Sequence, residues 1–484
     1  MNKIKDTETD KLNDVASDFM NFVQVSVMSV PCIWLYFTKD TSNSSLTEYS
    51  VKIMICYFLG ALITCRTVIG YFKIELLYVL YLSLMLSFAF NPTVFVINSI
   101  LAFNVFNTYL KVPYFLPVQF LLYYMNNKEI GFDIFSIAIG INYILSIFFE
   151  KIGQLKSLDH EVCNIFSILL TNIFYLTGTS NMSIPFKILH GTLSALICVI
   201  LINYGISILM TKLFKPHVYV QSTILSFVIV LGFPLLTDHF IQIHDSMTPL
   251  QWLINYITTS EIRLKIFFTW LIVVATLVPT FVMLQSRVSL NTSRKIWHFL
   301  IFLMITIPFK YDSKFVKIAL AGIIPLFLCI EYIRFLKLEP VGSYLDSTLR
   351  SFADERDLQG PLIISYIYLI LGISFPLFLY DSPVGLISLG VGDSLASIIG
   401  KKFGRYRWPD SEKTIEGTVA FICSTFVVCE ILKSSLNYFE NTNWYKLFII
   451  CFLSGILEGN SILNDNILIP SFMLICERLQ NLCY

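Results

Sequence analysis

Long apolar stretches recur along almost the whole chain, and they restrict what it can fold into. A membrane hydrocarbon core is about 30 Å thick, so a helix needs about 20 apolar residues to cross it. Because backbone N–H and C=O groups in lipid must be paired within the segment, each such stretch must be a helix. The sequence therefore predicts an all-α fold, a polytopic integral membrane helical bundle with about 15–17 transmembrane helices. The stretches that fit lie near residues 20–37, 52–71, 75–91, 93–111, 131–149, 162–178, 186–210, 218–240, 264–285, 296–309, 315–336, 361–380, 384–400, 416–434, 445–457 and 467–478, with a shorter one at 113–125.

The composition also favours a membrane protein. Of 484 residues, 56% are hydrophobic and only 14% are charged, whereas about 25% of the residues of a soluble domain are charged. The formal net charge is +1, so no overall field attracts nucleic acid, and we expect no nucleic-acid partner. The 11 cysteines form no C-x-x-C pair, which argues against a zinc ribbon or a thioredoxin-like motif.

Polar residues are unevenly distributed between the two parts of the chain. Residues 1–285 are aromatic and aliphatic spans joined by short loops, whereas four polar clusters occur in residues 286–484, at 286–298, 331–357, 401–414 and 457–466. Two apolar spans separate each cluster from the next, so all four should lie on one side of the membrane. The first three clusters carry 12 basic residues against 5 in the opposite loops, and the positive-inside rule places that side in the cytosol.

The segment GVGDSLASIIGKKFGRYRWPDSEKTIEGT, residues 390–418, is the most informative of these. Its Asp393 stands among small residues inside an apolar stretch, where an ionisable group costs a few kcal/mol and is a candidate for function. The alternative is a helix-packing surface, because the spacing of Gly392 and Ala396 lets membrane helices approach closely. The segment does not match the P-loop pattern, since Leu395 stands where a glycine is required.

Five basic residues follow in the same segment, and two readings fit them. They are typical of side chains that anchor a helix end at lipid headgroups. They also suit phosphate binding, because Gly400, Gly404 and Gly417 permit backbone N–H groups to approach an anion and Thr414 and Thr418 add hydroxyl donors. The basic residues are Lys401, Lys402, Arg405, Arg407 and Lys413.

Two acidic positions in the C-terminal region have similar alternatives. Glu416 opens an apolar segment, where the helix dipole favours a carboxylate, but magnesium also prefers one or two carboxylates together with phosphate oxygens. Glu458, Asp465 and Asn466 lie between two short apolar segments. They form either a solvated turn or a second acidic group that completes a metal site or orients a hydroxyl.

The remaining clusters give weaker signals. Arg294 and His298 are four residues apart and would share a helix face with Lys295 beside them, although a single histidine near a span end is more often structural. Glu331 and Arg334, three residues apart, can pair with each other. The run that contains Asp354 and Asp357 is also typical of a charged loop.

The segment at 390–418, followed by LEGNSILNDNILIP, resembles the dolichol kinase family, and it is similar at a greater distance to phytol kinases and to phosphatidate cytidylyltransferases. The blocks RKIWH, EYIRFLKLEPVG, FADERD and YIYLILGISFPLFL resemble further parts of the dolichol kinase branch. The resemblance covers roughly residues 286–475, and residues 1–285 share only their many spans. Tyr366 stands where some animal relatives are expected to have histidine.

The resemblance implies a reaction and a location. It implies transfer of the γ-phosphoryl group of CTP to the terminal hydroxyl of dolichol, which gives dolichyl phosphate for protein glycosylation. The co-substrate would be CTP with Mg²⁺ or another divalent cation, and the lipid partner would be dolichol or a polyprenol within the bilayer. The enzyme would be a multi-pass protein of the endoplasmic reticulum membrane with its CTP site facing the cytosol, and residues 286–484 would form the catalytic region.

The resemblance also assigns roles to particular residues. Asp393, Asp465 and Glu416 are the expected catalytic residues, and Asp393 and Glu416 the expected metal ligands. The expected CTP-binding residues are Gly392, Ser394, Lys401, Lys402, Gly404, Lys413, Thr414, Gly417 and Thr418. Possible supporting residues are Arg294, Lys295, His298, Glu331, Arg334, Asp354, Asp357, Glu458 and Asn466.

Two other functions compete with this reading. Another CTP-using prenol kinase, or a lipid cytidylyltransferase that makes a CDP-lipid and releases pyrophosphate, would need a similar site. A membrane transporter also has many spans and intramembrane acidic residues. The gathering of polar groups on one side, rather than at the middle of two matching halves, argues against a transporter.

Overall fold

The computed structural model describes most of the chain, and the helical class predicted from the sequence is confirmed. Within the described residues the regular elements are helices, and the exception to helical pairing is one isolated antiparallel bridge between Arg407 and Thr414. The chain divides into two compact units, Met1–Gly153 with Leu158–Leu176 and Phe375–Tyr484, and Gln154–Ser157 with Thr177–Ser374. The described residues are 2–37, 55–62, 73–90, 92–125, 131–153, 158–177, 182–213, 217–241, 243, 247–284, 290–351, 353, 357–358, 360–409, 411–461 and 463–482.

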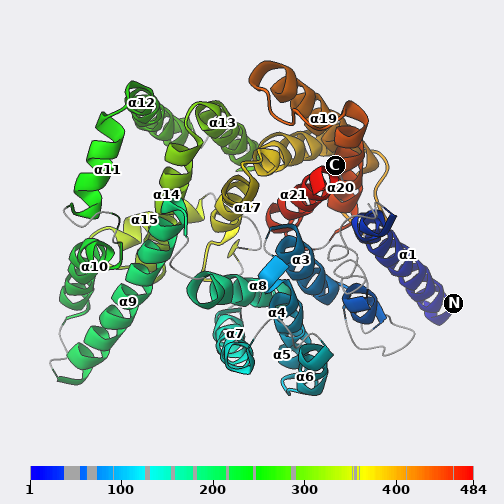
Figure 1. Cartoon of the computed structure of the whole chain (residues 1–484), viewed down its shortest axis with the longest axis horizontal. Helices are drawn as coiled ribbons and strands as arrows, with labels where there is room; N and C mark the ends of the chain where they lie inside the picture. Colours follow the sequence, from blue (N-terminus) through cyan, green and yellow to red (C-terminus); the bar gives the residue numbers. More distant parts are fainter. Residues whose placement is uncertain are drawn as a thin grey trace. The chain divides into compact units, whose positions relative to one another are not determined.

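The first unit joins the two ends of the chain (Figure 1). Its N-terminal helices α1 and α3 pack against α20 and α21 from the C-terminal end. The division at residue 286 was drawn from the distribution of polar clusters rather than from packing, and as a functional division it stays a prediction. The elements are α1 (Asn2–Phe37), α3 (Glu75–Phe90), α4 (Pro92–Ala102), α5 (Asn104–Leu110), α6 (Leu116–Met125), α7 (Phe132–Gly153), α8 (His160–Thr171), η1 (Asn172–Leu176), the end of α17 (Ser365–Tyr380), η4 (Leu386–Gly392), α18 (Asp393–Phe403), α19 (Ile415–Leu436), α20 (Trp444–Asn460) and α21 (Asp465–Leu482).

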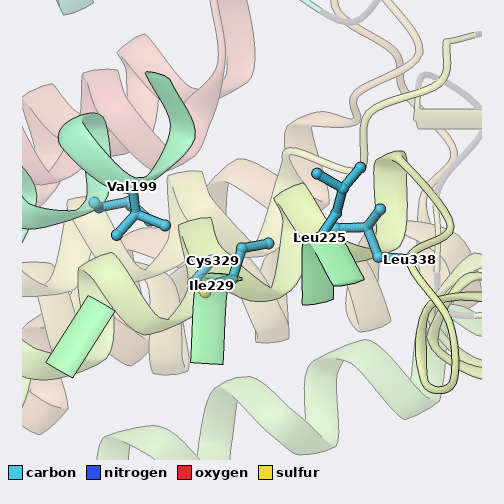
Figure 2. Close-up of a cluster of buried hydrophobic side chains, with 6 residues drawn as sticks. Val199, Leu225, Ile229, Cys329 and Leu338 are labelled. Atoms are coloured by element: carbon cyan, nitrogen blue, oxygen red, sulfur yellow. The ribbon is translucent and has the colours of Figure 1, made fainter. Parts of the chain in front are cut away.

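The second unit is built around three long helices, α9, α10 and α14. Buried Val199, Leu225, Ile229, Cys329 and Leu338 meet between them and form an apolar core (Figure 2). The elements are α9 (Ile184–Leu213), α10 (Val218–Phe240), α11 (Pro249–Thr258), α12 (Glu261–Leu284), α13 (Leu290–Tyr311), α14 (Ser313–Phe335), α15 (Gly342–Arg350) and the start of α17.

Five described helices are long and apolar enough to cross a membrane. They are α7, α9, α10, α14 and α19, which have between 22 and 30 residues and a mean hydropathy of 1.8 to 2.3 over the most apolar window. Other segments predicted to span, such as Glu75–Ser87 and Ser365–Tyr380, are shorter apolar helices. The chain is therefore a multi-pass helical membrane protein, whereas the exact number of crossings stays a prediction.

Amide side chains hold part of the first unit together. Asn104 on α5 donates to Asn142 on α7 at 2.5 Å, and Asn142 donates to Ser167 on α8 at 3.0 Å. Gln119 on α6 donates to Asn104 at 2.8 Å. These side chains are fully buried, where an unpaired amide would cost several kcal/mol. The paired amides fix the register of helices whose apolar faces alone would allow sliding.

Candidate active site

Asp393 lies where a π-helical segment becomes an ordinary helix. The π-helix η4 ends at Gly392, and α18 begins at Asp393. A Cβ added to Gly392 would lie 2.6 Å from Thr425 Cγ2 and 2.7 Å from Phe421 Cε2, so α19 packs directly on this backbone. Ser394 is fully buried, whereas Asp393 is half-buried. Short π-helical segments are frequent at functional sites, and this one presents the carboxylate predicted from the sequence.

Thr414 starts α19 and is surrounded by glycines. Its hydroxyl caps the helix by accepting a hydrogen bond from the Gly417 N–H at 3.1 Å. A Cβ at Gly400 would lie 2.8 Å from Thr414 Oγ1, one at Gly404 2.5 Å from Thr414 Cγ2, and one at Gly417 3.0 Å from the Ala396 carbonyl oxygen. The close approach of α18 and α19 therefore requires these glycines, whatever contact they make with a phosphate.

The loop between α18 and α19 folds back on itself. The Trp408 N–H donates to the Lys413 carbonyl at 2.9 Å, and the Ile415 N–H donates to the Tyr406 carbonyl at 2.8 Å. The Glu416 carboxylate accepts from the N–H groups of Arg405, at 2.9 Å, and Tyr406, at 3.2 Å. Glu416 therefore anchors the loop, and its predicted role as a metal ligand stays a prediction. The predicted cations Lys401, Lys402, Arg405 and Arg407 are exposed along this loop and the end of α18.

Lys413 connects the loop to the ends of α20 and α21. Its Nζ lies 2.7 Å from Asp465 Oδ2 and 3.1 Å from Glu458 Oε1, and it donates to the Glu458 carbonyl at 2.5 Å. Burial alone would lower the pKa of Lys413, but the charges of Asp465 and Glu458 outweigh it and raise this pKa above its ordinary value. Lys413 is therefore an ammonium ion at neutral pH. Two polar clusters that are about 50 residues apart in the sequence form one site here.

The charge of Asp393 also acts on this group, through Glu458. The charges of Asp393, Asp465 and Lys413 all act on Glu458, so carboxylates from α18, α20 and α21 are electrostatically coupled. The group contains three carboxyl groups and one ammonium, so its acidic members outnumber its basic one. An acidic group of this kind attracts a divalent cation or a hydrogen-bond donor rather than a free anion.

A tryptophan fixes the loop to α19 and packs it against α20. The Trp408 Nε1–H donates to Thr418 Oγ1 at 2.9 Å. A Cβ at Gly459 would lie 2.4 Å from both of these atoms, so only glycine lets Trp408 and Thr418 reach α20 here. Thr418 is 4% exposed; its hydroxyl serves this contact, and nucleotide binding by it stays a prediction. At the start of α21, the Asn466 N–H donates to Asn464 Oδ1 at 3.0 Å.

Sequence reasoning missed two residues of the N-terminal region that reach this site. Tyr78 on α3 donates from its hydroxyl to Gln24 Oε1 on α1 at 2.7 Å, and Gln24 donates to the Asn460 carbonyl at 2.7 Å. A glutamine inside the apolar stretch 20–37 was the available signal, because a buried amide needs partners. Its partners are about 50 and 436 residues away along the chain, and one sequence does not show them.

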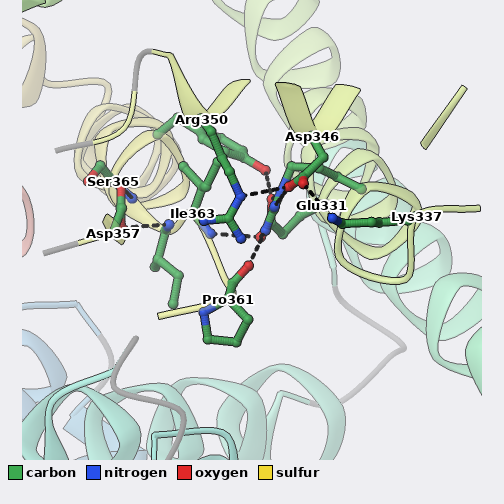
Figure 3. A network of polar contacts seen from close by, with 11 residues as sticks. Glu331, Lys337, Asp346, Arg350, Asp357, Pro361, Ile363 and Ser365 are labelled. Carbon is green, nitrogen blue, oxygen red and sulfur yellow. Dashed lines mark hydrogen bonds and ion pairs between the residues drawn. The ribbon is translucent and has the colours of Figure 1, made fainter. Parts of the chain in front are cut away.

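The second unit contains a separate charged network, which includes Glu331, Asp346 and Arg350 (Figure 3). Arg334 makes contacts at its centre. The Arg334 guanidinium binds both carboxylate oxygens of Glu331, at 2.8 and 2.6 Å, so the predicted pairing of these residues is confirmed. It also lies 2.5 Å from Asp346 Oδ1 and donates to the Pro361 carbonyl. Burial alone would raise the pKa of Asp346, but hydrogen bonds from Lys337, Arg350 and Arg334 outweigh it and lower this pKa.

The same network fixes the start of α17. Glu331 accepts from the Ile363 N–H at 2.7 Å and from the Tyr366 hydroxyl at 2.7 Å. Asp357 is 3% exposed and accepts from the Ile364 N–H at 3.0 Å and from the Ser365 hydroxyl at 2.5 Å (Figure 3). It thus caps a helix instead of lying in a solvated loop. The unexpected Tyr366 has a clear place here as a donor to Glu331.

The other predicted supporting residues are located as follows. Lys295 and His298 on α13 are buried at 8% and 6% exposure, and Arg294 is half-buried. Asp354 lies outside the described residues. The second unit therefore contributes a buried structural network, and its residues' roles in catalysis stay predictions.

No ready-made cage for a metal occurs in the described residues: no three histidine, cysteine or acidic side chains there are grouped as a complete ligand set. Mg²⁺ does not need such a set, because it is held by one or two carboxylates together with substrate phosphates and water. The Asp393 carboxylate, at the start of α18, is a donor of this kind. The donor set is therefore compatible with a divalent cation that arrives with a nucleotide.

These features define a multi-pass helical membrane protein with a mixed acidic and basic site at one end of the α18–α21 helices. A family model described as the dolichol kinase N-terminal domain matches residues 12–178. A dolichol kinase of Saccharomyces cerevisiae is 44% identical over 479 residues, 96% of this chain and 90% of that protein. The chain belongs to the dolichol kinase family.

More distant relatives include a second dolichol kinase and a probable phytol kinase. A dolichol kinase of Schizosaccharomyces pombe is 32% identical over 333 residues, which cover 63% of this chain and 65% of that protein. A probable phytol kinase of Oryza sativa is 30% identical over 211 residues, 40% of this chain and 66% of that protein. No solved structure matches. The similarity includes the N-terminal region, which the sequence alone left unassigned.

Proposed function

We propose that the protein is a dolichol kinase that transfers the γ-phosphoryl group of CTP to the terminal hydroxyl of dolichol or a related polyprenol. The observation that carries the proposal is the pairing of Lys413 with Glu458 and Asp465, on which the charge of Asp393 also acts, beside a loop of exposed cations. Relatives named dolichol kinase, one of them 44% identical over nearly the whole chain, support the acceptor. CTP as donor rests on the resemblance of residues 390–418 to this family.

The roles of the residues follow from charge and position. Phosphoryl transfer requires in-line placement and neutralisation of spread negative charge more than covalent help. The exposed Lys401, Lys402, Arg405 and Arg407 bind the phosphate chain electrostatically. Asp393 would hold Mg²⁺, which when bound neutralises charge on the β- and γ-phosphates.

Asp465 orients the acceptor. Lys413 holds the Asp465 carboxylate through one oxygen, Oδ2, at 2.7 Å. The prenol hydroxyl donates to this carboxylate while its oxygen forms a bond to the γ-phosphorus. The bond from that phosphorus to the bridging oxygen of the CTP breaks, CDP leaves, and the hydroxyl proton passes to the carboxylate. The prenol chain stays in the bilayer and reaches the site laterally between helices.

The location of the reaction is part of the proposal. Clustered basic residues favour the cytosolic side for the loop at 401–414, by the positive-inside rule. The family resemblance favours the endoplasmic reticulum membrane, where dolichyl phosphate serves protein glycosylation. Protease accessibility of an epitope inserted after Trp408 in sealed microsomes tests the sidedness directly, because cleavage in intact vesicles requires a cytosolic loop.

An assay with differently labelled nucleotides separates the kinase from its main rival. Membranes that contain the protein receive dolichol with CTP labelled in the γ-phosphate, CTP labelled in the α-phosphate, or γ-labelled ATP. A CTP-dependent kinase moves only the γ-label of CTP into lipid. A cytidylyltransferase moves the α-label into lipid instead, and transfer from ATP alone would contradict the choice of donor. Membranes with the Asp393→Asn variant give the background.

A further inference from the structure

Two buried polar residues connect the N-terminal helices to the acidic site by hydrogen bonds. Gln24 on α1 and Tyr78 on α3 are 1% and 0% exposed. The Tyr78 hydroxyl donates to Gln24 Oε1, and Gln24 Nε2 donates to the Asn460 carbonyl, both at 2.7 Å. These contacts lie inside the first unit, where α1 packs on α20 and α3 packs on α21 (Figure 1).

These hydrogen bonds reach the turn between α20 and α21, which separates Glu458 from Asp465. Asn460 is the last residue of α20, two positions after Glu458, and α21 begins at Asp465. Through Gln24, the Tyr78 hydroxyl is connected to the Asn460 carbonyl at the start of this turn. The pair therefore holds the turn from one side, while Lys413 binds Glu458 and Asp465 from the other.

Packing alone does not account for this pair. A phenylalanine and a leucine would fill similar volume without burying an amide and a hydroxyl, which cost free energy unless they are hydrogen-bonded. Tyr81, one turn along α3 and 1% exposed, shows the contrast. Among the described residues its hydroxyl has no hydrogen-bond partner, so it is buried as an aromatic ring beside Phe472.

We infer that Gln24 and Tyr78 are positioning residues of the active site, which set the α20–α21 turn and thereby hold Glu458 and Asp465 at their spacing around Lys413. The inference rests on the proposed kinase function. It gives the N-terminal helices a direct part in the chemistry, through the Asn460–Ser461 backbone and without contact to the nucleotide. A partner of this kind typically changes activity by 10- to 100-fold when it is lost.

Purified protein in detergent, with γ-labelled CTP and a soluble short prenol, tests the inference. Tyr78→Phe removes only the hydroxyl, and we expect kcat to fall about 10-fold while KM for CTP stays within about twofold. Tyr81→Phe is the matched control, with the same atom removed from the same helix, and it should retain the wild-type kcat. Gln24→Ala should resemble Tyr78→Phe.

A double variant shows whether the two residues act as one unit. Because Tyr78 reaches the turn partly through Gln24, the Gln24→Ala, Tyr78→Phe variant should be no slower than the slower single variant. If kcat of the double variant falls by the product of the two single losses, the two residues do not act as one unit. Unfolding temperatures are measured in parallel, and a kcat loss that disappears when all variants are assayed well below their unfolding temperatures would assign the pair to stability alone.

The result also separates this inference from the function on which it rests. A wild-type protein that transfers no phosphate from CTP to any prenol contradicts the proposed function. An active wild type with an equally active Tyr78→Phe variant overturns the positioning role and leaves the kinase assignment intact.

Discussion

The Arg334 network and the Lys413 site use the same residue types for different purposes. Arg334 is 1% exposed, and Glu331, Asp346 and a backbone carbonyl bind its guanidinium. The Lys413 and Asp465 side chains remain 29% and 28% exposed although they form an ion pair. A buried, saturated network holds the fold, whereas a partly exposed ion pair can exchange a partner for a ligand.

Geometry explains the difference. Glu331 and Arg334 lie on one turn of one helix, so their bidentate pairing is fixed when α14 forms. The Lys413 site draws on three helices and a loop, and each of its charges can move with its own element. Charged groups collected from several elements are typical of sites that bind and react.

The largest expected effect is a loss of stability, and it should come from Arg334→Leu. Removing one member of a buried charge network leaves the others uncompensated and typically costs about 3–5 kcal/mol. We expect the variant to accumulate poorly and to unfold at a much lower temperature in detergent. Arg350→Leu is the control, because that side chain is 35% exposed and pairs with the same Asp346, so its loss should cost no more than about 1 kcal/mol. A stable but inactive Arg334→Leu protein would move this network into the catalytic machinery.

Asp393→Asn should do the opposite: it should lower kcat and leave the unfolding temperature unchanged. Loss of a charge that acts on the reacting phosphates costs about 100-fold in kcat, whereas a half-buried carboxamide of the same size should leave the unfolding temperature near that of the wild type. Asp381→Asn, at an exposed position after α17, controls for the loss of an acidic residue. An Asp393→Asn protein that is well folded and fully active would refute the role of this carboxylate.

Gly459→Ala should give a smaller, mixed effect. The added Cβ would lie 2.4 Å from Trp408 Nε1 and Thr418 Oγ1, so the loop must move, at a cost of about 1–3 kcal/mol. We expect both the unfolding temperature and kcat to fall, because the displaced loop carries Lys413. Gly140→Ala on α7 is the control, since nothing lies within 4 Å of a Cβ there. Equal behaviour of the two alanine variants would contradict the close packing of Trp408 against α20.

The smallest expected effect is on the pH dependence of kcat. The folded protein raises the pKa of Lys413 above its ordinary value of 10.5, so the ion pair's contribution to stability is fully present below pH 10.5 and is lost as pH rises through the raised pKa. From about pH 7 to about pH 9, Lys413→Arg and wild type should therefore show the same pH dependence of kcat. If kcat rises or falls with pH in this range in the wild type but not in Lys413→Arg, then Lys413 titrates there.

The sequence predicted some of these features for physical reasons that can be named. Long apolar stretches predicted the helical class, because lipid allows no other arrangement for them. The short spacing of Glu331 and Arg334 predicted their pairing, since residues three apart share a helix face. The two C-terminal clusters could be placed together by counting spans, and the contact of Lys413 with Asp465 agrees.

Other features depend on contacts between distant parts of the chain. Asp357 looked like part of a charged loop because its cap on α17 exists only when the chain turns back at Pro361. The second role of the glycines around Thr414, which is to let α19 approach α18, could not be predicted, since a single sequence does not show which helix lies against them. Gln24 and Tyr78 were missed because their partners come from the opposite end of the chain.

The joining of both chain ends in one unit also has a consequence for biosynthesis. Helix α3 ends at Phe90, and its partner α21 begins only at Asp465. At about 5–20 residues per second, a ribosome needs on the order of 20–75 seconds to make the intervening chain. During that interval Gln24 and Tyr78 have been synthesised but Asn460 has not, so the acidic site is among the last parts of the protein to assemble.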